Sequence, residues 1–230
     1  MENKSGILYI IATPIGNLKD ITLRALDVLK EADVIACEDT RHTLKLLNAY
    51  SISKRLISCR AANEEKAARR IVSMLDEGLT VAYASDAGTP GLSDPGRILV
   101  RKARDEGFKV IPVPGVSAFG ALVSIGAFPD KAVTFEGFLS PKPGRRRKRL
   151  KELLDRPEAV IIYESPFRII KLITDIADLF PEREILIGRE MTKIHEEFLE
   201  GPVEQVLELL KKHENVKGEF SVLVSGRKKR

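Results

Sequence analysis

The sequence predicts an α/β protein built of two domains. Short apolar runs alternate with amphipathic segments along the 230-residue chain. The apolar runs of the first half are continuous, as is typical of parallel strands buried on both faces. Around Pro114-Gly115 the pattern restarts without a long linker. We therefore expect one domain over residues 1–115 and a second over 116–230, each large enough to bury a core of its own.

The first half has the order of a βαβ series. Asp20 is the expected N-cap of a helix with Leu23, Leu26 and Leu29 on one face, and Asn63 that of a helix ending at Gly78. A further helix ends at Gly107. The expected strands are Ile7–Ala12, Val34–Cys37, Thr80–Ala84 and Lys109–Val113. This order predicts a parallel sheet with helices on both faces.

The second half continues the alternation of strands and helices. The expected strands lie near Val133–Phe138, Ala159–Tyr163, Glu184–Ile187 and Glu219–Val224. The expected helices lie near Lys148–Leu154, Phe167–Leu179 and Val203–Lys212. The second domain is therefore also α/β.

Composition predicts a soluble cytoplasmic protein. Apolar residues make up 43% and charged residues 31% of the chain, an ordinary globular balance. The longest nearly apolar stretch, 119–128, is too short to span a membrane, and the first residues lack a signal-peptide pattern. The two cysteines, Cys37 and Cys59, form no CxxC and have no histidine cluster nearby, so we expect neither a disulfide framework nor a metal site.

Four segments follow the expected strands of the first half, where open α/β sheets bind ligands. They are residues 13–17, 38–41, 85–96 and 114–118. The third contains three glycines and two prolines between Asp86 and Gly96, which favours a stiff loop that approaches a ligand over a passive connection. The chain has no GxGxxG after its first strand, and residues 91–98 lack the P-loop lysine, so a dinucleotide or ATP site is disfavoured.

A basic cluster lies in the second half. Residues 145–151 carry six positive charges, on Arg145, Arg146, Arg147, Lys148, Arg149 and Lys151, and four more end the chain at 227–230. The internal cluster has few acidic neighbours in sequence, which favours binding of a nucleic acid through its phosphates. The alternative is a solvated segment, and for the terminal cluster we favour that alternative.

Seven short motifs follow one another along nearly the whole chain. They are the segments 9–18 (YIIATPIGNL), 37–43 (CEDTRHT), 85–90 (SDAGTP), 135–139 (FEGFL), 163–165 (YES), 189–193 (REMTK) and 217–219 (KGE). In this order they resemble the bacterial family of 16S rRNA ribose 2′-O-methyltransferases that modify a decoding-centre cytidine, a family similar in fold to the tetrapyrrole methylases. Two features depart from the family. Arg60-Ala61-Ala62 stands where members usually have His-x-His, and the chain stops at Arg230, so any RNA contact made by a longer C-terminus is expected to be missing.

The resemblance implies two domains of the tetrapyrrole methylase type, with S-adenosylmethionine bound in a cleft between them and the acceptor on the side of the first domain. It further implies a homodimer, to which apolar residues such as Phe128 and Phe135 would contribute, and 16S rRNA or the 30S subunit as partner. The matching donor-binding positions are Pro14, Ile15, Ser85, Asp86, Thr89, Ser117, Ala118, Glu164 and Met191. For Asp86 a loop-capping role is the alternative.

The implied reaction is an in-line attack of a ribose 2′-oxygen on the methyl carbon of a sulfonium, aided by a general base. Glu38, Asp39 and Glu64 are the candidate bases, and Arg41 or Lys193 would place the phosphate or polarise the hydroxyl. For residues 38–41 the alternative is a salt-bridged helix start capped by Asp39 or Thr40.

Two other functions remain open. A tetrapyrrole or other small-molecule methylase would use the same fold and donor but would leave the basic cluster without a purpose. A non-catalytic ribosome-binding protein would keep the basic surface but would not bind the donor.

Overall fold

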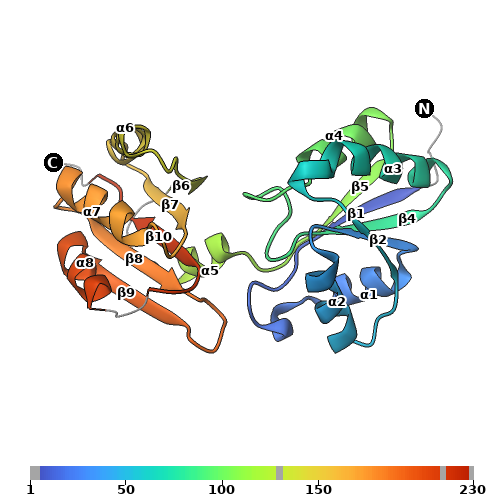
Figure 1. Cartoon of the computed structure of the whole chain (residues 1–230), viewed down its shortest axis with the longest axis horizontal. Helices are drawn as coiled ribbons and strands as arrows, with labels where there is room; N and C mark the ends of the chain where they lie inside the picture. Colours follow the sequence, from blue (N-terminus) through green and yellow to red (C-terminus); the bar gives the residue numbers. More distant parts are fainter. Residues whose placement is uncertain (1–5, 128–131, 213–215, 228–230) are drawn as a thin grey trace. The chain divides into compact units, whose positions relative to one another are not determined.

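The computed structural model divides the chain into two compact units, Met1–Ser117 and Ala118–Arg230, which are described separately (Figure 1). The structure describes residues 6–127, 132–212 and 216–227. Phe128 and residues 228–230 of the terminal basic cluster lie outside this part of the chain.

The first unit is built on a five-stranded sheet in which every neighbouring pair is parallel. The strand order is β3 (Arg55–Ser58), β2 (Val34–Cys37), β4 (Thr80–Ala84), β1 (Ile7–Ile11) and β5 (Lys109–Val113). The predicted parallel sheet is therefore confirmed. β2 and β4 are almost entirely buried, because helices cover both faces of the sheet.

The helices of the first unit lie on both faces of the sheet, and the direction in which the chain crosses the sheet decides which face each helix covers. α1 (Leu23–Glu31) and α2 (Thr40–Ala49) share one core, and α3 (Glu64–Asp76) and α4 (Arg97–Asp105) share the other. The chain leaves β1 towards β2 and leaves β4 towards β5, in opposite directions across the sheet. Because these crossovers are right-handed, opposite directions place α1 and α4 on opposite faces. The adjacent strands β1 and β4 thus form the topological switch point of the sheet.

Three details of the first unit differ from the sequence prediction. The N-cap of α1 is Thr22, whose hydroxyl accepts a hydrogen bond from the Ala25 amide, and the prediction of Asp20 is wrong because that residue lies in a 3₁₀ turn. Helix α2, capped by Asp39, was expected only as the alternative for residues 38–41, and strand β3 was not predicted. β3 is an edge strand in which Ile57 alone is fully buried, so it lacks the continuous apolar run of the other strands.

The second unit has a mixed five-stranded sheet. Its strand order is β6 (Val133–Phe138), β7 (Ala159–Glu164), β10 (Phe220–Val224), β8 (Glu184–Arg189) and β9 (Glu197–Pro202). Only β6 and β7 are parallel neighbours. The helices α6 (Pro143–Leu154), α7 (Ile169–Leu179) and α8 (Val203–Lys211) pack into one core with the sheet, and α5 (Ala118–Ile125) contacts β10. The unpredicted β9 is an edge strand in which half-buried and exposed residues alternate and none is fully buried.

No helix in the described residues combines the length and the apolar character needed to cross a membrane.

Candidate functional site

The loops that follow β1 and β4 are tied together at the switch point. The backbones of Thr13 and Gly88 exchange two hydrogen bonds of 2.9 Å, and the Thr13 hydroxyl donates to the Ser85 carbonyl at 3.1 Å. Gly88 has a φ of +76°, a conformation that favours glycine, and Ile15 lies against it. The Ser85 hydroxyl donates back into its own loop, to the carbonyl of Gly88 at 3.3 Å. The loop is therefore held in one conformation by groups within the unit.

Asp86 connects the loop after β4 to the segment that follows β2. Its Oδ1 accepts a hydrogen bond of 2.9 Å from the backbone amide of Asp39, the residue that starts α2. This is the capping type of role that the sequence left open for Asp86. The loop after β4 therefore fixes the position of the segment 38–41.

Asp39 and Arg41 form a paired helix start. Asp39 is the N-cap of α2, and its Oδ1 accepts from the Arg41 amide at 2.9 Å. The Arg41 guanidinium adds two hydrogen bonds to the same carboxylate, at 3.1 and 2.7 Å. These contacts lower the pKa of Asp39 well below its usual range. A carboxylate with so low a proton affinity and with both oxygens engaged is a poor general base.

Glu38 has the opposite environment. It directly follows β2 and is half-buried. Burial raises its pKa, and the nearby Asp86 carboxylate raises it further. A carboxylate with a raised pKa at the carboxyl end of a central strand has the properties that proton abstraction needs.

Glu64 is engaged in holding α4. Its Oε1 accepts hydrogen bonds from the amides of Gly96 and Ile98, both at 2.9 Å, and from that of Leu99 at 3.4 Å. These amides belong to the unsatisfied first turn of α4, which has no side-chain cap of its own. Glu64 is itself buried, so this carboxylate acts as a cap supplied from α3.

In the second unit, Glu164 lies at the end of β7 and is only 2% exposed. Its Oε1 accepts from the Ser165 amide and pairs with the Arg168 guanidinium, both at 2.7 Å. Its Oε2 is buried and has no hydrogen-bond partner among the described residues. Buried acceptors are rarely left unsatisfied, so Oε2 is available to a donor group from a ligand. Arg168 was missed by sequence reasoning, although its spacing of four from Glu164 was the available signal.

Met191 and Lys193 lie beyond β8, at the same end of the sheet as Glu164. Phe220 of β10 is in register with Glu164 on one side and with Arg189 on the other, so the ends of β7 and β8 are level. Met191 is buried against Gly188, where a Cβ would come within 2.6 Å of its sulfur. Lys193 donates to Glu190 at 2.8 Å and to Glu219 at 3.1 Å. Burial lowers the pKa of Lys193, but these hydrogen bonds outweigh it and raise the pKa above its usual value.

The other residues that are expected to bind the donor have the following places in the structure. Pro14 is buried, and Thr89 is half-buried, in the two loops at the switch point. Ser117 is the last residue of the first unit, and Ala118 begins α5 of the second. In the first unit, the carboxyl ends of the strands therefore bring together residues 14, 15, 38, 39, 41, 85, 86 and 89. In the second unit, the carboxyl ends of β7 and β8 bring together residues 164, 191 and 193.

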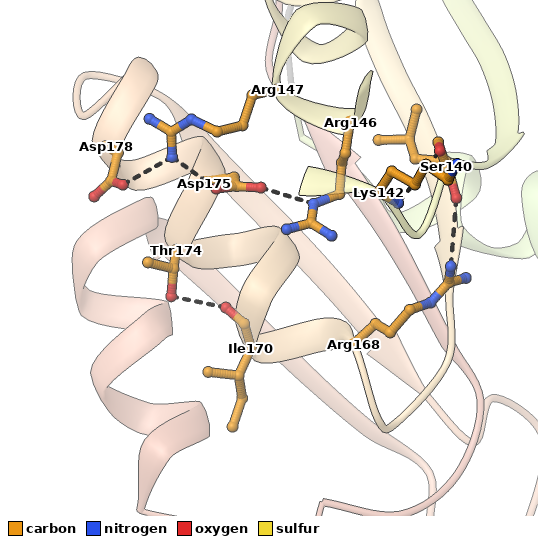
Figure 2. A network of polar contacts seen from close by, with 10 residues as sticks. Ser140, Lys142, Arg146, Arg147, Arg168, Ile170, Thr174, Asp175 and Asp178 are labelled. Carbon is orange, nitrogen blue, oxygen red and sulfur yellow. Dashed lines mark hydrogen bonds and ion pairs between the residues drawn. The ribbon is translucent and has the colours of Figure 1, made fainter. Parts of the chain in front are cut away.

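The basic cluster 145–151 lies on α6, and the expectation that it lacks acidic compensation is wrong. Figure 2 shows Arg146 and Arg147 both directed to Asp175 of α7, at 2.7 Å each. Arg147 also pairs with Asp178 at 3.0 Å. The Arg146 side chain is only 5% exposed, so it belongs to the interior of the unit and not to its surface.

Arg149 of α6 is paired as well. It binds Glu136 of β6 through two hydrogen bonds of 2.7 Å and Glu152 through one of 3.2 Å. These contacts raise its pKa above the usual value for arginine. Arg145, Lys148 and Lys151 are exposed. Acidic residues distant in sequence thus neutralise much of this cluster.

Comparison with known proteins identifies the family. Residues 7–207 match the family model of tetrapyrrole (corrin/porphyrin) methylases. A protein of Borrelia garinii subsp. bavariensis named ribosomal RNA small subunit methyltransferase I is 52% identical over 220 residues, which cover 95% of this chain and 98% of that protein. Relatives of the same name from Thermotoga maritima and Bacillus subtilis are 44% and 40% identical.

Solved structures share the fold at low identity. Uroporphyrin-III-C-methyltransferase from Thermus thermophilus is 22% identical, with a TM-score of 0.68 over 96% of this chain and 94% of that one. Uroporphyrin-III C-methyl transferase from the same organism, complexed with S-adenyl homocysteine, has a TM-score of 0.65 at 18% identity, over 94% of this chain and 96% of that one. The chain belongs to the tetrapyrrole methylase family and, within it, to the group named ribosomal RNA small subunit methyltransferase I. The resemblance and the fold class predicted from the sequence are confirmed.

Proposed function

We propose that this protein is an S-adenosylmethionine-dependent methyltransferase that modifies the ribose 2′-oxygen of a cytidine in 16S rRNA. The observation that carries the proposal is the locked loop 85–91 at the β1/β4 switch point of a chain whose relatives are named rRNA methyltransferases. Switch points are where open α/β sheets bind their ligands. The cytidine and the 2′-position rest on the family resemblance alone.

The residues present fit a bound donor. The unsatisfied Oε2 of Glu164 is a buried acceptor suited to a hydroxyl or amino group, and the apolar surfaces of Ile15 and Met191 suit an adenosine or methionine moiety. We propose that both units supply donor contacts, through Pro14, Ile15, Ser85, Asp86, Thr89 and Ser117 in the first and Ala118, Glu164 and Met191 in the second. Because the Ser85 hydroxyl and one oxygen of Asp86 are engaged within the protein, contacts from this loop are made largely by its backbone. The donor supplies an electrophilic methyl group on a sulfonium, so no metal is needed.

Glu38 is the proposed general base. It accepts the proton of the ribose hydroxyl while the oxygen forms a bond to the methyl carbon and the carbon–sulfur bond breaks, which leaves a neutral thioether. Asp39 and Glu64 act instead as structural carboxylates, for α2 and α4 respectively. Most of the rate enhancement comes from alignment of oxygen, carbon and sulfur. The acceptor lies on the side of the first unit, where Glu38 and Arg41 are found.

Phosphate contacts come from cations that keep free donors. Arg41 is paired through one edge of its guanidinium, yet its side chain is 87% exposed and can place a phosphate. Arg145, Lys148 and Lys151 are the exposed cations of α6, whereas Arg146, Arg147 and Arg149 serve mainly in ion pairs. Lys193 links the turn 190–193 to Glu219 through its ion pairs with Glu190 and Glu219. We further propose a cytoplasmic homodimer that acts on the 30S subunit.

Calorimetric titration with S-adenosylmethionine tests the donor, and transfer of labelled methyl groups tests the acceptor. We expect saturable heat that S-adenosylhomocysteine competes away, and label in 16S rRNA of 30S subunits isolated from cells that lack the protein. Label in a porphyrin or corrinoid instead of RNA would establish a small-molecule methylase. Absence of donor binding together with retention on the subunit would establish a non-catalytic binding protein.

The substitution Glu38→Gln tests the general base. We expect kcat to fall by about 10²–10⁴-fold, because a general base contributes about that factor, with donor affinity unchanged. In the native protein, kcat falls as the pH drops through the raised pKa of Glu38, and the variant lacks this acid limb. An unchanged kcat would assign the proton to another group.

The same variant has an expected signature in stability. The raised pKa of folded Glu38 means that its stabilising contribution is present below the ordinary value of 4.5 and is lost as the pH rises through the folded value. Glu38→Gln therefore gains thermal stability relative to the native protein between acidic and neutral pH. Thermal unfolding at a series of pH values measures this difference.

A further inference from the structure

The first unit contains a cavity of about 470 Å³ on the α4 side of its sheet. Two of its lining residues, Pro90 and Gly91, belong to the loop at the switch point, and Ile10 of β1 contributes apolar surface. The other lining residues come from the N-cap and body of α4 and include Arg97, Arg101 and Arg104. The cavity thus adjoins the candidate site but is lined by a different set of side chains.

The three arginines form a single stripe along α4. Positions 97, 101 and 104 are spaced by four and three, which places them on one face of an α-helix. The buried residues of this helix, Leu99 and Ala103, point into the core on another face. All three arginines are exposed. We call residues 97, 101 and 104 the α4 arginine stripe.

The charge of the stripe is little compensated. Asp105 is the one acidic residue among those that line the cavity. Arg97 donates from Nε to the Gly91 carbonyl at 3.4 Å, which leaves its terminal nitrogens available. Within the described residues, neither Arg101 nor Arg104 has an ion-pair partner. The ion pair that α4 does make, between Lys102 and Glu65 at 3.1 Å, lies away from the cavity lining.

The start of the stripe is held rigidly. Gly96, the N-cap of α4, has a φ of +122°, and a Cβ there would lie 2.8 Å from the Tyr83 ring. The Gly96 amide is bound by Glu64, which is buried. The first arginine therefore directly follows a backbone position that β4 and α3 both fix, so the start of the helix that bears the stripe is held in place without a ligand.

We propose that the α4 arginine stripe and its cavity bind the phosphodiester backbone of the RNA substrate. This inference rests on the proposed function, since it names the surface by which the acceptor is held. The stripe runs about 10 Å along the helix axis, at about 1.5 Å per residue, which suits a polyanion better than a single small anion. Exposed guanidinium groups bind phosphates with directed hydrogen bonds. Ile10 and Val100 offer apolar surface to a sugar or base beside the phosphates.

The double variant Arg101→Gln, Arg104→Gln tests the proposal, with binding to 30S subunits measured over a range of salt concentrations. Each phosphate contact to single-stranded RNA contributes about 0.7 to the slope of log K against log salt, so the slope should fall by about 1.4 and the affinity by about 25-fold near 0.1 M salt. The charge-conserving pair Arg101→Lys, Arg104→Lys should restore most of the slope. Arg69→Gln, Arg70→Gln on α3 removes the same charge from exposed positions outside the cavity lining and serves as the matched control.

Donor binding and thermal unfolding of each variant separate this inference from the function on which it rests. We expect the donor affinity and the thermal stability of each variant to match those of the native protein, because the substituted arginines are exposed and are not among the residues proposed to contact the donor. A native slope in the double variant, with RNA methylation intact, would overturn the inference alone. A native protein that neither binds nor methylates RNA would overturn the proposed function as well. An equal loss of slope in the Arg69 and Arg70 control would show general charge attraction and not a site, and a loss of affinity without any salt dependence would point to a protein component of the subunit.

Discussion

Helices α4 and α6 both carry several arginines, but they differ in how far acidic side chains neutralise them. α6 has the denser sequence cluster, yet Arg146, Arg147 and Arg149 are bound by acidic side chains from α7, β6 and α6 itself. α4 has three arginines scattered among other residues, yet they share one face and line a cavity. The density of charged residues along the sequence is therefore a poor measure of the charge that is available for binding, because ion pairs form between residues that are distant in sequence.

The buried pair Arg146–Asp175 gives the largest expected effect. Arg146→Ala leaves the Asp175 carboxylate buried with part of its compensation removed, at a cost of about 3–5 kcal/mol in the free energy of unfolding. Denaturant unfolding measures this loss, with Arg145→Ala on the exposed face of the same helix as control. If the two variants were equally stable, Arg146 would be an ordinary surface cation and the contrast between the helices would fail.

Removal of the cap that Glu64 supplies to α4 comes next. Glu64→Ala leaves backbone amides of the first turn buried without an acceptor, which costs about 1–3 kcal/mol. Because the same contact fixes the start of the α4 arginine stripe, RNA affinity should fall in the folded variant while donor affinity stays unchanged. Glu65→Ala, on the exposed neighbour, is the control. Loss of kcat at saturating RNA would instead favour Glu64 as the base.

The exposed cations of α6 give the smallest expected effect and sharpen the comparison most directly. Arg145→Gln, Lys148→Gln should change the free energy of unfolding by less than about 0.5 kcal/mol, as is usual for surface positions. We expect the salt slope of RNA binding to fall by less than in the Arg101→Gln, Arg104→Gln variant, because the neighbouring acids reduce the local positive potential. A larger fall on α6 would reverse the assignment of the main phosphate-binding helix.

Much of the architecture was predictable because buried parallel strands are locally encoded. The continuous apolar runs around Leu8, Val81 and Ile161 identified their strands correctly. Edge strands β3 and β9 were missed, since they pack on few neighbours and lack such a pattern. The N-cap of α1 was misplaced by two residues, because Asp20 and Thr22 are both good capping residues and only the path of the chain chooses between them.

The candidate site divides in the same way. The sequence by itself determined the family, the loop 85–91 and the acidic segment 38–41, because each depends on residue type and order. It could not rank Glu38, Asp39 and Glu64, which differ only in their partners: Arg41 and the α2 amides for Asp39, the α4 amides for Glu64, and partial burial beside Asp86 for Glu38.

The charged surface was decided by tertiary structure alone. The cluster at 145–151 was visible in the sequence, but its neutralisation depends on residues 28 to 31 positions away that α7 brings beside α6, and on Glu136 of β6. The α4 arginine stripe was hidden by intervening residues until the helix and the cavity placed its members together. Local sequence encodes which elements form, whereas the electrostatic role of a side chain depends on neighbours that only the folded chain provides.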